Sequence, residues 1–332
     1  MMASEQTPRP PAVSVILPTF NRLHYLRPAV DSVFAQTYDD WELVIADDGS
    51  EEETRAYLSS LAVLPRVKVL WLPHSGNPGA VRNAALRKAQ GEYIAFLDSD
   101  DLWMPSKLEI QMGALRAGPC RHWSYTAINH INHSGAQINA ALSASWVYYE
   151  GNIFQHLLTL KAGVAMPTVI VSRQILERVG SFDEYQGQHE DYHLWLRLAM
   201  QCQVGVIRQP LACVRCHKEH FSDFGVGALS ARDRMLERIS TLVTDSRQRT
   251  AVRTERARNA ALLAVANAAA GDHSAAWGTV SDSWRSSWRC AVWWAGVARA
   301  LAHLYLPVRV RTLIREYRRT ARQASRHGVI EP

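Results

Sequence analysis

The chain has 332 residues, of which 47% are hydrophobic and 20% are charged, so its composition excludes an intrinsically disordered protein. Five cysteines do not indicate a disulfide framework, and the polar residues 1–11 contain no apolar segment of a secretory signal, which together predict the reducing cytoplasm. The net charge of +6 is uneven, because residues 231–332 carry 18 arginines, no lysine and 8 acidic residues, whereas the rest of the chain carries a net charge of −4.

Short apolar runs alternate with amphipathic segments over the first hundred residues. Strands are predicted at residues 13–20, 41–46, 67–72 and 93–97, with helices at residues 25–36, 51–61 and 79–90. This alternation is typical of βαβ units. It predicts an α/β fold with a doubly wound, mostly parallel sheet.

A polar segment follows each of these four predicted strands. The segments are residues 18–21, 47–50, 74–77 and 98–101. In a doubly wound sheet, ligands bind beyond the carboxyl ends of the strands. We therefore expect the four segments to line one rim of the sheet.

The last of these segments, Asp98-Ser99-Asp100-Asp101, places three carboxylates within four residues. Such a cluster repels itself and is costly to desolvate unless a cation shares the site. Oxygen ligands suit Mg²⁺ or Mn²⁺, and such an ion suits a phosphate-bearing substrate. The alternative is that Asp100 and Asp101 cap a helix that begins near Pro105.

Beyond residue 104 the pattern is less regular. Helices are predicted at residues 104–117, 174–179 and 191–201, strands at residues 169–172 and 211–214, and almost continuous helix from residue 229 onward. We expect one domain over residues 12–225, with halves at 12–103 and 104–225, and an arginine-rich helical extension over residues 229–332.

Within that extension, residues 290–308 form an apolar run with Arg299 near its centre. A charge there costs about 2.5–3.5 kcal/mol on an insertion scale, so a membrane span is not expected. The predicted apolar face consists of Trp294, Val297, Leu301, Leu304 and Tyr305. The run predicts either a helix on an anionic bilayer surface or a helix packed on the domain of residues 12–225. Nucleic acid is not an expected partner, because the basic stretch lacks a recognisable reading motif.

Cys213-Val214-Arg215-Cys216-His217 matches the pattern of covalent haem attachment, and with His220 it could begin a zinc site. Haem attachment would require export, and a zinc site would require ligands that converge from loops. The pattern lies at a predicted strand instead, so neither group is expected.

Five motifs follow one another along the chain: Val-Ser-Val-Ile-Leu-Pro-Thr-Phe-Asn (13–21), Ala-Asp-Asp-Gly-Ser (46–50), Asn-Pro-Gly-Ala-Val-Arg-Asn (77–83), Leu-Asp-Ser-Asp-Asp (97–101) and Glu-Asp-Tyr-His-Leu-Trp-Leu-Arg (190–197). This ordered set resembles family 2 glycosyltransferases, which have the Rossmann-like GT-A fold. The resemblance covers about residues 12–220. It implies a nucleotide-binding half at residues 12–103 and an acceptor half at residues 104–225.

The resemblance implies a hexosyltransferase of class EC 2.4 that moves a sugar, with inversion, from a nucleotide-diphosphate donor to a saccharide or glycolipid hydroxyl. The donor would be a UDP- or dTDP-sugar. A divalent Mn²⁺ or Mg²⁺ would stabilise the leaving diphosphate. Such an enzyme would build a cell-envelope polysaccharide in the cytoplasm or at the inner face of the cell membrane.

For the donor, the resemblance implies that Phe20 offers an aromatic face to the base, that Asp48 accepts a hydrogen bond from the base, and that Arg82 contacts the base edge or the phosphates. Asp98-Ser99-Asp100 would be the DXD motif. The metal would be bound by Asp100 or Asp101, with His217 as a further contact. The implied donor-binding residues are Pro18, Thr19, Phe20, Asn21, Asp48, Asn77, Gly79, Arg82, Asn83, Asp98 and Asp100.

The sequence after His217, Lys218-Glu219-His220, departs from the family pattern, which has glycine or asparagine soon after the histidine. This departure leaves two interpretations of His217 open, a metal or diphosphate contact and no contact at all. His74, His156 and His189 are expected to be surface or loop residues.

For the acceptor, the resemblance implies that Asp191 is the general base and that Glu190 is its neighbour and competitor for that role. The attacking hydroxyl must lose its proton, so a carboxylate is required nearby. Asp191 begins a predicted helix, whose dipole favours the ionised carboxylate. The alternative is that Asp191 is only an N-cap.

Two other functions are weighed against the transferase. A sugar-phosphate nucleotidyltransferase would need a glycine-rich, basic loop after the first strand, and residues 18–21 are not such a loop. A non-catalytic nucleotide-sugar or glycan-binding module would not need the acidic set that includes Asp48, Asp100, Asp101 and Asp191.

Overall fold

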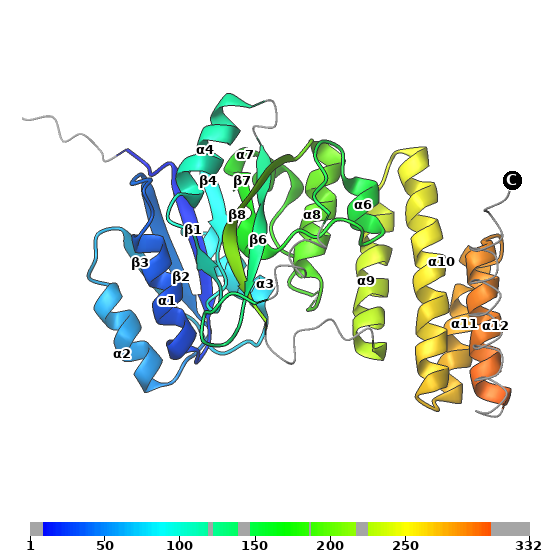
Figure 1. Cartoon of the computed structure of the whole chain (residues 1–332). Helices are drawn as coiled ribbons and strands as arrows, with labels where there is room; N and C mark the ends of the chain where they lie inside the picture. The colour runs from blue at the N-terminus through cyan, green and yellow to red at the C-terminus, as the bar shows by residue number, and fades with distance from the viewer. Residues whose placement is uncertain (1–8, 119–121, 139–146, 186, 217–224, 307–332) are drawn as a thin grey trace, which may run out of the picture. The chain divides into compact units, whose positions relative to one another are not determined.

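The computed structural model of the chain describes residues 9–118, 122–138, 147–185, 187–216 and 225–306. The chain divides into two compact units near residue 222. The N-terminal unit contains the sheet, and the described part of the C-terminal unit is helical (Figure 1). The predicted helical C-terminal region is therefore confirmed.

The described part of the N-terminal unit contains one eight-stranded sheet, in the order β3-β2-β1-β4-β7-β6-β8-β5 (Figure 1). β1 pairs in parallel with β2 and β4, and β2 pairs in parallel with β3, as the alternating pattern predicts. Beyond β4 the sheet is mixed, since β7 is antiparallel to both β4 and β6, and β6 is parallel to β8. The strands are β1 (Val13–Thr19), β2 (Trp41–Asp47), β3 (Val67–Trp71), β4 (Tyr93–Phe96), β5 (Leu102–Trp103), β6 (Trp123–Ile131), β7 (Ile170–Ser172) and β8 (Gly205–Arg215). The mostly parallel α/β class is confirmed.

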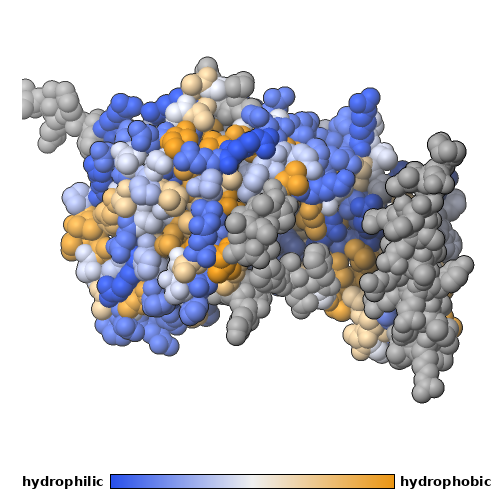
Figure 2. All heavy atoms as spheres, in the orientation of Figure 1, coloured by the Kyte–Doolittle hydropathy of each residue, from blue (hydrophilic) through white to orange (hydrophobic). Residues whose placement is uncertain are grey.

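The central strands are covered by helices on both faces. All of β2 and nearly all of β1 are buried, which is the burial expected of parallel strands in an α/β sheet. On one face the apolar residues of β1 and β2 pack with α1 (Leu23–Phe34), α2 (Glu52–Leu61) and α4 (Lys107–Ala117). The visible surface of this unit is mostly hydrophilic, with smaller apolar patches between the polar residues (Figure 2).

The opposite face of the sheet packs against α3 (Pro78–Leu86) and against α8 (Glu190–Gln201), which begins with two acidic residues. α3 packs on β1 and β2. On β4, the ring of Phe96 makes edge-to-face contacts with Phe182 at 5.4 Å and with Trp195 at 6.1 Å between centroids. The remaining helices of this unit are α6 (Phe154–Leu158), the 3₁₀ helix η1 (Met166–Thr168) and α7 (Arg173–Val179).

A buried polar cluster holds β6, a strand that the sequence pattern does not predict, next to α4. The side-chain amide of Gln111 donates to the carbonyl oxygens of Ser124 at 3.0 Å and Thr168 at 2.9 Å. Its own oxygen accepts from Nζ of Lys107 at 2.6 Å. Burial lowers the pKa of Lys107 to about 7. Hydrogen bonds between side chains and backbone therefore fix β6 in the mixed part of the sheet.

The C-terminal unit contains α9 (Val226–Leu242), α10 (Ser246–Ala269), α11 (His273–Ser287) and α12 (Ala291–Tyr305). α10 packs against the other three helices, and α10, α11 and α12 run side by side in Figure 1. A buried ion pair of 3.2 Å between Arg232 and Glu255 joins α9 to α10. None of the described helices is both long and apolar enough to cross a bilayer.

Small residues let α12 approach α10 closely. A Cβ atom added at Gly296 would lie 2.2 Å from the Cβ of Ala261, so only glycine fits there. Trp293 and Val297 of α12 are buried in the same cluster, together with alanines of α10. The predicted apolar face of residues 290–308 is therefore partly wrong, because Val297 packs inside the unit, whereas Trp294 and Tyr305 are exposed.

Candidate functional site

A cavity of about 360 Å³ lies at the carboxyl ends of β1, β2 and β4, and the predicted polar segments meet there. Its walls come from the loops after these strands, from the loop after β3 and from the start of α3. The lining residues are Pro18, Thr19, Phe20, Arg22, Asp48, His74, Gly76, Pro78, Val81, Arg82, Asp98, Ser99 and Asp100. The structure thus brings together seven of the predicted donor-binding residues.

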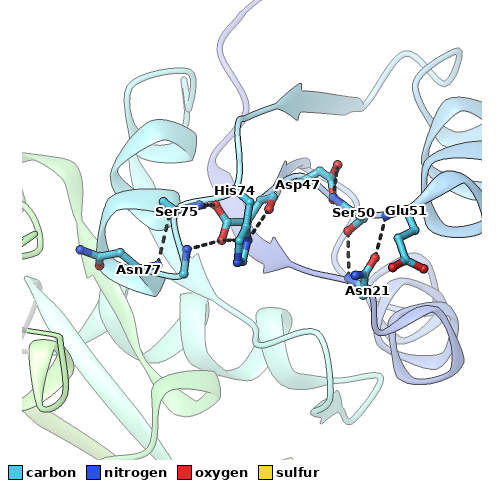
Figure 3. A network of polar contacts seen from close by, with 9 residues as sticks. Asn21, Asp47, Ser50, Glu51, His74, Ser75 and Asn77 are labelled. Carbon is cyan, nitrogen blue, oxygen red and sulfur yellow. Dashed lines mark hydrogen bonds and ion pairs between the residues drawn. The ribbon is translucent and has the colours of Figure 1, made fainter.

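The buried carboxylate of Asp48 fixes the loop after β3. Its Oδ1 accepts from the backbone N–H and the hydroxyl of Ser75, both at 2.8 Å, and its Oδ2 accepts from the N–H of Gly76 at 2.9 Å. Nδ1 of His74 lies 3.1 Å from the same Oδ2. Gly49, with φ of 79°, lies so close to His74 that a Cβ would meet its backbone nitrogen at 2.8 Å. The β2 and β3 loops therefore form one fixed unit, part of which is drawn in Figure 3.

His74 also forms part of an aromatic wall of the cavity. Its ring stacks on Phe20 with 4.0 Å between centroids and 19° between planes, and Phe20 remains 39% exposed. His74 is an exposed loop residue, as expected, but its place in the wall of the cavity was not predicted. The signal was available, because His74 begins the polar segment after the third predicted strand.

Asn21 joins the end of β1 to the start of α2 (Figure 3). Its backbone N–H donates to Oγ of Ser50 at 2.9 Å, and its Oδ1 accepts from the N–H of Glu51 at 2.6 Å. The N–H of Ser50 in turn donates to the carboxylate of Asp47 at 3.2 Å. Asn21 is not among the cavity-lining residues. It supports the rim, and φ of 52° at this residue suits asparagine.

Asn77, Gly79 and Asn83 also lie outside the cavity lining. Asn77 caps α3 by accepting from the N–H of Ala80 at 3.2 Å. The side chain of Asn83 donates to the carbonyl of Phe182 at 2.9 Å and accepts from its N–H at 3.0 Å. These predicted donor-binding residues therefore anchor α3 and the segment that leads to α8.

Arg82 connects the wall of the cavity to the start of α8. One nitrogen lies 2.6 Å from Asp98 and the other lies 2.8 Å from Glu190. Burial would lower the pKa of the Arg82 guanidinium, but these two carboxylates outweigh it and raise the pKa above its ordinary value. Arg82 therefore stays charged and holds Glu190 in place.

Asp191 lies in the first turn of α8, next to Glu190. Burial, with the charge of Glu190, raises the pKa of Asp191 to about 7, although the N–H of Tyr192 donates to its Oδ1 at 2.7 Å. A carboxylate with this pKa is suited to general-base chemistry near neutral pH. The N-cap of α8 is His189, so the alternative that Asp191 is only an N-cap is wrong.

The acidic residues after β4 lie in two places, some at the cavity and one against the sheet. Asp98 and Asp100 line the cavity, and Oδ2 of Asp100 pairs with Arg22 at 2.5 Å. Asp101 is buried, and its Oδ1 accepts from the N–H of Arg215 at 2.8 Å. Burial, together with Asp100 and Asp98, raises the pKa of Asp101 well above its usual value. The helix-capping alternative is wrong, because α4 begins at Lys107 with Ser106 as its N-cap.

A divalent cation fits the cavity side of this segment better than the sheet side. Asp98 and Asp100 present oxygen atoms to the cavity, as Mg²⁺ or Mn²⁺ prefers, while Asp101 supports β8. In the described part of the chain, no group of three or more His, Cys, Asp or Glu residues could hold a metal by itself. The predicted contact His217 lies outside the described residues.

Two arginines of the site were not predicted from the sequence. Arg22 lines the cavity and neutralises Asp100. Arg215, at the end of β8, donates from Nε to the carbonyl of Asp100 at 2.7 Å and from its terminal nitrogen to the carbonyl of Asn132 at 2.6 Å. Arg22 could have been found because it directly follows a rim segment. Arg215 could not, because its role depends on the pairing of β8.

The sequence is similar to those of known glycosyltransferases. The sequence model of the family described as Glycosyl transferase family 2 matches residues 14–180, just over half of the chain. An uncharacterized glycosyltransferase of Rickettsia felis is 34% identical over 203 residues, 61% of this chain, but the match spans only 33% of that protein. The UDP-Glc:alpha-D-GlcNAc-diphosphoundecaprenol beta-1,3-glucosyltransferase WfgD of Escherichia coli is 30% identical over 60% of this chain and 75% of its own length.

Solved structures share the fold at low sequence identity. S. aureus TarS has a TM-score of 0.60 and 17% identity, over 88% of this chain and 54% of its own. The mannosyltransferase PcManGT of Pyrobaculum calidifontis, in complex with GDP-Man and Mn²⁺, has a TM-score of 0.56 and 19% identity, over 93% of this chain and 85% of its own. Both likenesses support the GT-A fold.

Proposed function

Because the chain belongs to glycosyltransferase family 2, we propose that it transfers a sugar from a nucleoside diphosphate donor to an acceptor hydroxyl, with inversion at the anomeric carbon. The observation that carries this proposal is the single cavity that combines an aromatic wall and an acidic wall, joined through Arg82 to Glu190 and the neighbouring Asp191.

The donor would be a UDP- or dTDP-sugar whose base lies against the wall formed by Phe20 and His74. Asp48 would accept a hydrogen bond from the base, with its oxygens already aligned by the loop after β3. The name of the E. coli relative contains UDP-Glc, and TarS has been solved in complex with UDP-GlcNAc. Both names favour a uridine donor.

Asp100, with Asp98 beside it, would hold Mn²⁺ or Mg²⁺ together with oxygens of the donor diphosphate. When bound, the ion would stabilise the negative charge that develops on the leaving diphosphate. Asp101 and Arg215 keep the acidic loop in position through the hydrogen bond between them. Arg22 pairs with Asp100 and neutralises part of the charge of the acidic wall.

Asp191 would accept the proton of the acceptor hydroxyl as the oxygen attacks the anomeric carbon and the bond to the diphosphate breaks. Glu190 is less suited to this role, because Arg82 pairs with its carboxylate at 2.8 Å. Burial raises the pKa of Asp191 to about 7, which suits this residue to accept a proton near neutral pH. Glu190 would instead help to orient the acceptor side.

The acceptor would be a saccharide or a lipid-linked saccharide of the cell envelope. Two relatives carry names of this kind: WfgD of E. coli, whose name contains a diphosphoundecaprenol acceptor, and the putative teichuronic acid biosynthesis glycosyltransferase TuaG of Bacillus subtilis. A lipid-linked acceptor would place the reaction at the inner face of the cell membrane.

Product analysis with a panel of nucleotide sugars tests the proposal. With Mn²⁺ and one member of the panel, we expect release of a nucleoside diphosphate and transfer or slow hydrolysis of the sugar. Release of pyrophosphate from a nucleoside triphosphate and a sugar phosphate would indicate a nucleotidyltransferase instead. Tight UDP binding without any turnover of the panel would indicate a non-catalytic binding module.

A further inference from the structure

Five exposed aromatic side chains line the seam between α11 and α12. On α11, Trp284 follows Trp277 by seven residues, and Trp288, the C-cap residue, follows by four more, a spacing that places all three on one side of the helix. On α12, Trp294 and Tyr305 share one side for the same reason, with Leu301 between them. The five residues of this aromatic seam are Trp277, Trp284, Trp288, Trp294 and Tyr305.

Direct contacts join the two rows of the aromatic seam. Nε1 of Trp277 donates to the hydroxyl of Tyr305 at 3.1 Å. The rings of Trp284 and Trp294 meet edge to face, with 5.3 Å between centroids. Nε1 of Trp294 donates to the carbonyl of Trp288 at 2.8 Å. The rows therefore form one continuous surface along the helix pair.

This surface faces solvent, although the C-terminal unit already has a core. The four tryptophans of the seam are 44%, 46%, 47% and 46% exposed and Tyr305 is 64% exposed, whereas Trp293 is 1% exposed against α10. Large exposed apolar surfaces of this kind mark interaction sites. Tryptophan and tyrosine are the residues that collect at the boundary between lipid and water.

Positive charge lies beside the aromatic seam. Arg285 and Arg289 each follow a seam tryptophan by one residue and are exposed, and the guanidinium of Arg289 lies 4.8 Å from the ring centroid of Trp288. Asp282, the acidic residue within α11, falls on the side of the helix opposite Trp284. Residues 307–332, which lie outside the described part of the chain, contain seven arginines and two glutamates. The partner must therefore be anionic as well as apolar.

We infer that the aromatic seam docks onto an anionic lipid bilayer, with α11 and α12 lying in the interfacial plane. An anionic bilayer offers apolar chains to the rings and phosphate groups to the arginines. A second copy of the chain would place Arg285 and Arg289 opposite the same residues, without carboxylates on that face of α11 or α12 to pair with them. This inference does not depend on the transferase reaction.

Vesicle flotation of the full chain tests the inference. Binding to vesicles of phosphatidylcholine with one quarter phosphatidylglycerol is expected to exceed binding to pure phosphatidylcholine. The double variant W284A/W294A should lose about tenfold in affinity through the lost apolar area. The affinity of the double variant R285Q/R289Q for the anionic vesicles should fall roughly fivefold per arginine, and this affinity should depend less on salt concentration. The matched control is W71A, because Trp71 is 40% exposed beside Arg55 but lies in the other unit. The W71A variant should bind the vesicles as tightly as the wild-type chain.

A second measurement does not require any variant to fold. Lipids brominated near the headgroup should quench the tryptophan fluorescence of the wild-type chain on vesicle binding, with a shift of emission to shorter wavelength. Equal vesicle binding by W284A/W294A and wild type would overturn the inference. The inference would also be overturned if the wild-type chain formed a concentration-dependent dimer that the W284A/W294A variant does not form, and if the brominated lipids did not quench its fluorescence.

Discussion

The two units of the molecule use their polar and aromatic residues in opposite ways. The N-terminal unit buries charges around its cavity, such as Asp48, Arg82 and Asp101, and satisfies them with one another and with backbone groups. The described part of the C-terminal unit packs alanines and glycine inside and leaves four of its five tryptophans exposed. The first arrangement fixes groups for the proposed chemistry, and the second leaves the aromatic seam accessible to a partner. Substitutions in the first unit should therefore change turnover, and those in the second should change stability or attachment.

The largest effect is expected for Asp191→Asn. Without a proton acceptor at the attacking hydroxyl, turnover should fall by about 10²- to 10⁴-fold. Affinity for UDP, measured by calorimetry, should remain within about twofold, because Asp191 is not among the cavity-lining residues. The control is Asp31→Asn on an exposed position of α1, which should leave both quantities unchanged. Unchanged turnover of the Asp191→Asn variant would remove this residue as the base.

Arg82→Gln should strongly destabilise the N-terminal unit. The substitution leaves Asp98 and Glu190 without their shared cation, and breaking a buried ion pair in this way costs about 3–5 kcal/mol. Urea unfolding monitored by tryptophan fluorescence measures the loss. Arg87→Gln, at an exposed position after α3, is the matched control and should change the free energy of unfolding by less than about 0.5 kcal/mol. A loss of similar size in both variants would contradict the role of the buried pair.

The pH dependence of turnover should follow Asp191. Burial raises its pKa to about 7, so the carboxyl group is protonated and inactive below that pH. We expect kcat to rise about tenfold per pH unit up to about pH 7 and then to level off. A stopped assay of donor turnover between pH 5 and pH 9 measures the profile. A flat profile across pH 6 to 8 would be inconsistent with a buried carboxylate base.

Gly296→Ala tests the close packing of the C-terminal unit. The added Cβ would lie 2.2 Å from the Cβ of Ala261, and overpacking of this kind costs about 1–3 kcal/mol. Gly278→Ala in α11 is the matched control, because a Cβ there meets nothing within 4 Å and the gain in helix propensity should stabilise the unit by up to about 1 kcal/mol. The temperature of thermal unfolding should therefore fall for Gly296→Ala and rise for Gly278→Ala. Two stabilised variants would mean that α10 and α12 are not closely packed.

The smallest effect is expected for His74→Ala. Removal of the ring stacked on Phe20 should weaken UDP binding by about threefold to tenfold, the value of one aromatic contact. His74→Phe keeps the stack but lacks the nitrogen near Asp48, so it should recover most of the affinity. Isothermal calorimetry distinguishes the two variants. Tighter binding by His74→Ala would show that the histidine covers the base site.

The first half of the N-terminal unit could be predicted from the sequence because each strand and helix there has its own local pattern. The four parallel strands and the rim at their ends follow from alternating apolar runs. Asp191 at the start of α8 also follows, since the helix has a clear amphipathic pattern. Local periodicity and global fold agree in this part of the chain.

The mixed half of the sheet could not be predicted in the same way. β6 is buried almost throughout and contains polar residues that pair inside the protein, so it shows neither polar alternation nor a purely apolar run. β8 begins at Gly205, before the predicted residue 211, because Pro210 and the register shift near Ala127 interrupt its pattern. The roles of Arg215 and Asp101 depend on that pairing. These two roles could therefore not be predicted from the local sequence.

The position of Val297 illustrates a limit of the helical wheel. The wheel groups it with Trp294 and Tyr305, but it cannot tell which flank of a wide apolar stripe meets a neighbouring helix. Gly296 determines which flank is buried, because the absence of a side chain there lets α12 approach α10 closely, and Val297 is buried next to it.

The double ion pair of Arg82 links two parts of the site. One guanidinium is shared by Asp98, on the wall of the cavity, and by Glu190, in the first turn of α8 beside Asp191. The pKa of Asp191 is raised mainly by burial and by Glu190, and it is also lowered by the charge of Arg82 and raised by that of Asp98. A ligand that displaces Asp98 from Arg82 would therefore change the charge balance around Asp191 without touching that residue.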